Sequence, residues 1–349
     1  MKMTGFMRGG MMAAGLALLA GCATTGVPIR GLSPVAVAAS GETEPVGTSN
    51  DDAADDPAIW RNAADPSASL IVATDKKAGL YVYGLDGRIK SFYDAGRVNN
   101  VDLIEQGGVI HVVASDRNDP ANAKLALFRL DGASGKLIPL GSVPGGAGEG
   151  YGVCVMAGAG GTITAFSVLK EGTIAEVAIT PGAQPEGRIV RTLKLATQTE
   201  GCAVDAATNS LYVGEEDVGI WRFDATGSST APVKVAAVDN QQLVADVEGL
   251  AVAKRADGSR ILVASSQGDN TYAVYRIGEG GALAYAGRFE VQGGPLGGAE
   301  ETDGIELVIG DFGPAFPGGL FVAQDGHNGT RAQNFKLVSW DAIRAALGL

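Results

Sequence analysis

Apolar runs of β-forming residues alternate with short polar clusters along most of the chain. Six stretches show the same order, an apolar run, a polar cluster and a second apolar run: "LIVATDKKAGLYVYGLDG", "VIHVVASDRNDPANAKLALFRLDG", "ITAFSVLKEGTIAEVAI", "LYVGEEDVGIWRFDATG", "ILVASSQGDNTYAVYRIGEG" and "GLFVAQDGHN" continued by "NFKLVSW". Runs of this length bounded by Gly-rich polar segments are typical of β-hairpins. Six copies in one chain indicate a repeated all-β architecture.

A second pattern interleaves with the first, an acidic residue placed at the start of an apolar run. Its members are Asp56, Asp102, Glu149, Glu200, Glu248 and Asp303, separated by 46, 47, 51, 48 and 55 residues. A period near fifty with four short strands per repeat predicts a six-bladed β-propeller with four antiparallel strands per blade. A parallel β-helix would need much shorter repeats, and helical periodicity is confined to the final "WDAIRAALGL".

The propeller gives these acidic residues a shared position. The innermost strand of each blade lines the central channel, so residues at equivalent strand starts form a ring around one mouth of it. The alternative is that each is a turn-forming residue with no further role. Four of the six are followed directly by glycine, which favours the ring.

The amino terminus reads as an export signal. Residues 1–21 contain Lys2 and Arg8 followed by an apolar stretch too short to span a membrane as a mature helix. The segment ends in "LAGC", the lipobox of bacterial lipoproteins, so we expect lipidation of Cys22; the alternative is an ordinary signal with a chance cysteine. Residues 22–41 are predicted to be a flexible tether and 42–349 the propeller. Ala23 suggests sorting to an outer membrane, facing the periplasm or the surface.

Composition narrows the chemistry. The chain carries a net charge of −12, and removal of residues 1–21 leaves 25 basic and 39 acidic residues, a net charge of −14. Nucleic acid is therefore excluded as a partner, because its binding depends on Lys and Arg. The only histidines, His111 and His327, are too few for a histidine-rich zinc site or a histidine-nucleophile phosphatase. Cys154 and Cys202 lie in apolar runs and are equally compatible with a disulfide and with buried thiols.

The polar clusters combine carboxylates and amides with basic side chains. Taken singly, each cluster is a solvated hairpin tip; taken together, they describe a hard-cation site beside an anion site. Oxygen-only ligands at irregular spacing favour Ca²⁺, which accepts six to eight oxygens. Lys76, Arg117 and Lys170 could then hold phosphate oxygens, Arg117 through a two-pronged contact and the lysines as point charges.

The chain resembles the β-propeller phytases, secreted bacterial enzymes that release phosphate from inositol hexakisphosphate with calcium. The resemblance rests on "DDPAIW", "KKAGLYVYGLDG", "NNVDL", "QTEGCAVD", "EEDVGIWRF", "VEGLAV", "SSQGDNTYAVY", "TDGIEL", "VAQDG" and "NFKLVSW", in this order along nearly the whole mature chain. It implies several calcium ions, held by Asp55, Asp56, Glu200, Glu216, Asp246, Glu248 and Asp303. It implies catalytic roles for Lys76, Arg117, Tyr151, Lys170 and Glu216, and substrate binding by Lys77 together with Lys76, Arg117 and Lys170.

The resemblance further implies direct hydrolysis by a metal-activated water, with phytate or calcium phytate as the partner. Membrane contact is expected only through the lipid, and the chain is expected to act as a monomer. The chain departs from the family pattern at "GGPLGGAEE", around Gly297, and at His327 and Asn328, where we expect a changed set of peripheral calcium ligands. Alternatives are a non-catalytic calcium-binding propeller lipoprotein, which would not need the basic residues, and a propeller lactonase or esterase, which normally uses more histidine.

Overall fold

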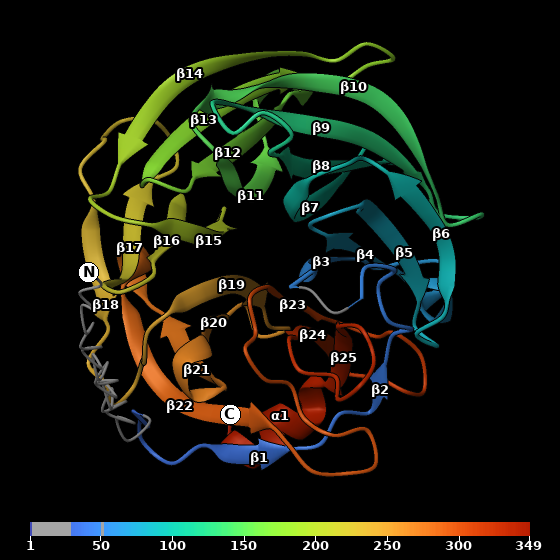
Figure 1. Ribbon diagram of the computed structural model, residues 1–349, viewed down its shortest axis with the longest axis vertical. Helices are drawn as coiled ribbons and strands as arrows, with labels where there is room; N and C mark the ends of the chain where they lie inside the picture. The colour runs from blue at the N-terminus through green and yellow to red at the C-terminus, as the bar shows by residue number, and fades with distance from the viewer. Residues whose placement is uncertain (2–28, 50–51) are drawn as a thin grey trace.

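Six β-sheets are arranged around a central axis in the computed structural model, which describes residue 1, residues 29–49 and residues 52–349. Figure 1 looks down this axis and shows the sheets as blades, each with its first strand innermost. Within the described ranges each blade has four consecutive antiparallel strands, or three completed by a strand from the amino terminus. The predicted six-bladed propeller is confirmed.

The strands of the first three blades follow one another without interruption along the chain. Blade 1 contains β3 (Ala54–Trp60), β4 (Leu70–Asp75), β5 (Gly79–Gly84) and β6 (Ile89–Asp94); blade 2 contains β7 (Val98–Gln106), β8 (Val109–Asp116), β9 (Asn122–Asp131) and β10 (Lys136–Ala147); blade 3 contains β11 (Gly150–Ala157), β12 (Ile163–Leu169), β13 (Thr173–Thr180) and β14 (Glu186–Lys194).

The other three blades follow in the same order, and blades 5 and 6 each take up one strand from the amino terminus. Blade 4 contains β15 (Thr199–Asp205), β16 (Ser210–Glu215), β17 (Gly219–Asp224) and β18 (Val233–Ala237); blade 5 contains β19 (Val247–Lys254), β20 (Arg260–Ser266), β21 (Thr271–Ile277), β22 (Leu283–Val291) and, outermost, β1 (Val35–Val37); blade 6 contains β23 (Ile305–Ile309), β24 (Gly319–Asp325), β25 (Asn334–Ser339) and β2 (Gly41–Glu42), followed by the helix α1 (Trp340–Leu347). No helix of the described chain is long and apolar enough to cross a membrane.

Apolar residues on both faces of the blades form the core between neighbouring sheets. Val72 and Val82 of blade 1, for example, pack in one cluster with Val112 and Leu130 of blade 2. The middle strands are buried on both faces, which explains why they read as continuous apolar runs in the sequence rather than as alternating ones.

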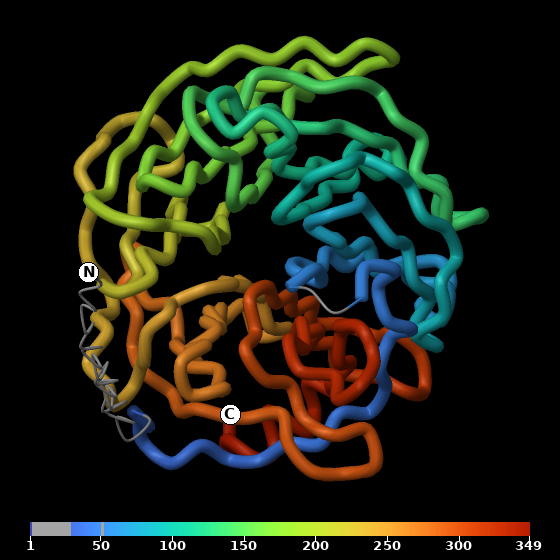
Figure 2. The backbone as a smooth tube through the Cα atoms, viewed as in Figure 1, coloured from blue at the N-terminus to red at the C-terminus, as the bar shows by residue number. Residues whose placement is uncertain are grey.

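The amino-terminal segment closes the ring. β2 pairs with β25, so that blade 6 combines strands from both ends of the chain, and β1 runs parallel to β22 on the outside of blade 5. Figure 2 shows this blue segment running along the orange and red blades. The backbone N–H of Gly31 already donates to Asp269, 2.9 Å away.

This arrangement corrects the later part of the predicted tether. Residues 31–41 lie against the propeller, because the alternating "PVAVA" at 34–38 places Val37 and then Ala39 in the core. That alternation of period two was the signal missed in the sequence. The predicted export signal and the lipidation site Cys22 lie outside the described residues.

A disulfide joins Cys154 of β11 to Cys202 of β15, with the two Cα atoms 5.8 Å apart. It settles the alternative between a bridge and free thiols. The bond links the inner strands of blades 3 and 4, and both cysteines are buried.

Removing this disulfide is expected to cost stability, because it closes a loop with a sequence separation of 48 residues. The Cys154→Ala/Cys202→Ala double variant should lose about 2–4 kcal/mol of unfolding free energy. Urea unfolding of the two proteins measures the difference. Coincident unfolding curves would show that the bond does not contribute.

Candidate metal and phosphate site

A β-bulge recurs at the start of the inner strands. In β3, β7, β11, β15 and β19 two residues of the inner strand lie opposite a single residue of the next strand, always starting one residue after the strand begins. Such bulges re-aim side chains and are frequent beside active sites. The first of the two bulge residues is Asp55, Asn99, Tyr151, Glu200 or Glu248, and Asp303 holds the corresponding place just before β23.

The second of the two bulge residues explains the recurrent glycines. A Cβ atom at Gly152 would clash with the carbonyl oxygen of Glu200, and one at Gly201 with that of Glu248. A Cβ atom at Gly249 would lie 2.7 Å from the carbonyl oxygen of Asp303. Each glycine therefore lets one inner strand approach the next, which brings the bulge side chains together around the mouth.

The predicted acidic ring is correct for blades 4, 5 and 6 and wrong in register for the other three. In blade 1 the ring position belongs to Asp55, while Asp56 accepts a hydrogen bond from the backbone N–H of Val101, 2.9 Å away. In blade 2 Asp102 lies three residues further along β7, where it accepts a bond from the N–H of Val155 at 2.7 Å. In blade 3 Glu149 precedes the strand. The residue at the ring position therefore differs from the predicted acidic residue by one to three positions along the chain, and the spacing in the sequence does not reveal this difference.

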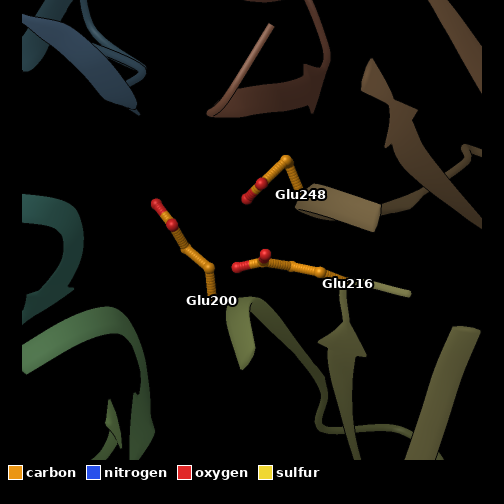
Figure 3. Close-up of side chains that lie close together, drawn as sticks. All are labelled: Glu200, Glu216 and Glu248. Carbon is orange, nitrogen blue, oxygen red and sulfur yellow. The ribbon is translucent and has the colours of Figure 1, made fainter. Parts of the chain in front are cut away.

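Three glutamates converge on one side of the mouth. Ligand atoms of Glu200, Glu216 and Glu248 lie within 4.8 Å of one another, and Figure 3 shows the three carboxylates pointing toward each other. All three residues are buried, yet Oε1 of Glu216 and Oε2 of Glu248 accept no hydrogen bond from the part of the chain described. Buried carboxylate oxygens without donors are costly unless a cation joins them, so this donor set fits a hard divalent cation.

Lys76 lies among the carboxylates of blades 1 and 6. Its Nζ atom is 2.8 Å from Asp303 Oδ2, 2.9 Å from Asp52 Oδ1 and 3.5 Å from Asp55 Oδ2. Asp52 is 64% exposed in its side chain but is part of this group. Neither oxygen of the fully buried Asp55 accepts a hydrogen bond within the described ranges. Lys76 is thus the built-in counter-ion of this half of the mouth.

The opposite side of the mouth is cationic. Two basic groups lie against the ring of Tyr151, with Arg117 Cζ 5.3 Å and Lys170 Nζ 4.8 Å from its centroid. The sequence pattern placed Glu149 in the acidic ring. Its Oε1 atom instead lies 3.6 Å from Arg117 Nε and 3.7 Å from Arg97 Nη2. A planar guanidinium and an ammonium gathered at one ring suit the oxygens of a phosphate.

The remaining predicted residues lie at the rim. Lys77 is exposed on the turn after β4, and Asp246 is partly buried just before β19. Burial and the charge of Asp217 raise the pKa of Asp246. The structure therefore brings Lys76, Arg117, Tyr151, Lys170 and five of the predicted carboxylates to one mouth, with Asp56 turned into the channel below and Asp246 at the edge.

The clustering perturbs the carboxylates strongly. Burial, with the charges of Asp55 and Glu248 added, raises the pKa of Glu200 well above its usual value, and burial has the same effect on Glu248. Burial raises the pKa of Asp303 to about 7, although Lys76 opposes the shift. For Lys76 burial alone would lower the pKa, but the charges of Asp55 and Asp303 raise it. Carboxyl groups with a raised pKa release their protons when a divalent cation binds to them.

These shifts predict that the calcium-free protein loses stability as the pH rises. A carboxyl group such as Asp303 has a pKa near 3.9 when unfolded and about 7 when folded, so its folded state holds the extra proton between these values. The contribution of this raised pKa to the unfolding free energy is complete below about pH 4 and is lost as the pH rises to about 7. Burial lowers the pKa of His111, and this shift makes stability rise with pH, but it concerns one group against several carboxyl groups. The melting temperature without calcium should fall from pH 5 to pH 8, and a constant or rising value would contradict the account.

Two functional candidates were missed in the sequence. Asn99 occupies the ring position of blade 2, and Arg97 extends the cationic side through Glu149. The stretch "NNVDL" stands in blade 2 where "DDPAI" stands in blade 1, and this equivalence was the available signal for Asn99. Arg97 carries no such signal, because it lies on the turn before the strand.

The fold and the site define a six-bladed propeller that carries an acidic cluster and a cationic side at one mouth. The family described as Phytase matches residues 10–349 of the chain. The 3-phytase of Bacillus subtilis (strain 168) is 37% identical over 329 residues, which cover 89% of this chain and 85% of that protein. A chain in the solved structure titled "Crystal Structure of Mitotic Checkpoint Complex" superposes with a TM-score of 0.51 at 15% identity, covering 95% of this chain and 87% of that one, which concerns the fold alone.

The chain belongs to the Phytase family. This agrees with the resemblance drawn from the sequence.

Proposed function

We propose that the protein hydrolyses phosphomonoester bonds of phytate in a calcium-dependent reaction at the mouth described above. The observation that carries this proposal is the opposition, within one mouth, of a buried glutamate cluster with unpartnered oxygens to a cationic side built on Tyr151. Its test is phosphate release from phytate at controlled free calcium.

Glu200, Glu216 and Glu248 would hold one calcium ion, and Asp55 and Asp303 provide further oxygen donors beside them. Bound calcium supplies charge neutralisation and lowers the pKa of water in the site. Asp303 and Asp55 are already bridged by Lys76, so the chain keeps part of its own counter-charge in place.

The cationic side binds and orients the substrate. Arg117 and Lys170, both in contact with the Tyr151 ring, hold oxygens of the phosphate to be cleaved, and Lys77 at the rim holds a neighbouring phosphate. Fixed positive groups of this kind stabilise the charge that develops on the phosphoryl oxygens.

Glu216 connects the two sides. It belongs to the glutamate cluster, and its pKa responds to Lys170 as well as to Asp246. Burial is the largest effect and raises the pKa of Glu216. A carboxylate with a raised pKa and a free oxygen suits the acceptance of a proton from the attacking water, and this is the role assigned to it.

The negative charge of the chain is compatible with this substrate. A protein with a net charge of −12 repels a free polyanion, whereas calcium phytate carries its own cations, which bridge carboxylate and phosphate. The calcium-bound form of the substrate therefore fits the mouth better than the free anion.

We also propose that the protein is exported and anchored through a lipid on Cys22, which the "LAGC" motif supports. Incorporation of a labelled fatty acid into the expressed chain, lost in the Cys22→Ser variant, tests this proposal. Equal labelling of both chains would refute it.

A further inference from the structure

Asn99 is the uncharged amide in a ring whose other members carry the proposed chemistry. The six bulge positions hold Asp55, Asn99, Tyr151, Glu200, Glu248 and Asp303. The first strand of blade 2 therefore aims Asn99 at the mouth by the same device that aims Glu200 and Tyr151. Asn99 is 1% exposed, so its amide must find its partners within the site.

Besides the neighbouring Asn100, the Asn99 side chain has two partners, which come from opposite sides of the mouth. Asn99 Nδ2 donates to Glu200 Oε1, 2.8 Å away, and the Asn99 carbonyl oxygen accepts a hydrogen bond from Arg117 Nη1. Glu200 belongs to the glutamate cluster and Arg117 to the cationic side. One planar amide thus spans the distance between a proposed metal ligand and a proposed phosphate ligand.

The backbone around Asn99 is itself tied down. The N–H of the next residue, Asn100, donates to Ser115 Oγ at 2.9 Å, and the Ser115 hydroxyl donates to the carbonyl oxygen of Tyr151 at 2.5 Å. The bulge of blade 2 is therefore fixed both to its own second strand and to the bulge of blade 3. Asn99 has little freedom to move away from its partners.

Only an amide satisfies both partners at once. A carboxylate would accept from Arg117 but would place a second negative charge against Glu200, and an apolar side chain would satisfy neither. We propose that Asn99 is a positioning residue that holds Glu200 and Arg117 in fixed relation, so that the metal-binding and phosphate-binding sides act on the same phosphate. This inference rests on the proposed function and concerns how its two halves are coupled.

The test compares Asn99→Ala with Asn99→Asp, using the exposed Asn122→Ala on β9 as the matched control. Calcium affinity is measured by titration calorimetry and by the rise in melting temperature with calcium, and KM and kcat are measured with phytate. Outer partners of metal ligands are typically worth about 10- to 100-fold. Asn99→Ala should weaken calcium binding by about this factor, lower kcat and raise KM.

Asn99→Asp restores the acceptor for Arg117 but not the donor to Glu200. Its KM should return close to the value of the unmodified protein while its calcium affinity stays altered. A purely structural role would lower the melting temperature of both variants without changing calcium affinity, KM or kcat, and that result would overturn the inference. If the alanine variant does not fold, Asn99→Asp alone is sufficient for the test, because an unchanged calcium affinity of Asn99→Asp would also overturn the inference.

The unmodified protein separates this inference from the proposed function. If it neither binds calcium nor releases phosphate from phytate, the proposed function fails and the inference fails with it. If it does both and Asn99→Ala matches it, only the inference fails.

Discussion

Glu216→Gln is expected to lower the rate of phosphate release from phytate by about 100-fold or more, since even the outer partners of metal ligands are worth 10- to 100-fold. The substitution keeps the size of the side chain but removes the charge from a cluster in which Glu200, Glu216 and Glu248 approach within 4.8 Å. It also removes the carboxylate that faces Lys170. The loss should fall on kcat and on the calcium concentration needed for activity.

The fold should survive this change. Relieving repulsion among three buried carboxylates does not weaken the calcium-free protein, so its melting temperature should be equal to or above that of the unmodified chain. Glu186→Gln on the exposed edge strand β14 is the matched control and should retain full activity. A Glu216→Gln protein with an unchanged rate would place the reaction elsewhere.

Lys76→Met should have the second large effect, and it is clearest in the calcium-free protein. Lys76 Nζ lies within 3.5 Å of carboxylate oxygens of Asp52, Asp55 and Asp303. The side chain of Asp55 is fully buried and that of Asp303 is 14% exposed. Removing one partner of a buried ion pair costs about 3–5 kcal/mol, because the other charge is left uncompensated. The variant should therefore unfold at lower urea concentration and lose most of its activity.

Calcium should restore part of this stability, because the ion supplies the positive charge that the variant lacks and binds the folded state alone. The gain in melting temperature on adding calcium should be larger for Lys76→Met than for the unmodified protein. Lys254→Met, at the exposed end of β19, controls for the loss of a lysine. If calcium stabilises Lys76→Met no more than the unmodified protein, Lys76 is not the counter-ion of a cation site.

The architecture was predictable because its signal is repeated. Buried middle strands give continuous apolar runs, such as Leu70–Asp75 and Ser210–Glu215, and six repeats average out local ambiguity. The segment at 31–41 was not predicted, because its small alternating residues resemble a linker until blades 5 and 6 are placed beside them.

The site was predictable in composition but not in register. Glu200, Glu248 and Asp303 stand where spacing placed them, whereas Asp55 replaces Asp56 and Tyr151 replaces Glu149 in the ring. A bulge at the start of each inner strand decides which residue faces the mouth. It inserts one extra residue without changing the apolar pattern from which strands are predicted. Lys76 contacts Asp303 of blade 6 and Asn99 contacts Glu200 of blade 4, so only the closed ring reveals these two contacts.

The central claim is that one mouth of this propeller hydrolyses phytate with calcium bound. Its most direct measurement is the release of phosphate from phytate by the purified protein, freed of metal and then assayed with added calcium or with excess chelator. Release with calcium and none with chelator is the predicted result. Equal release under both conditions, or none at any calcium concentration, would contradict it.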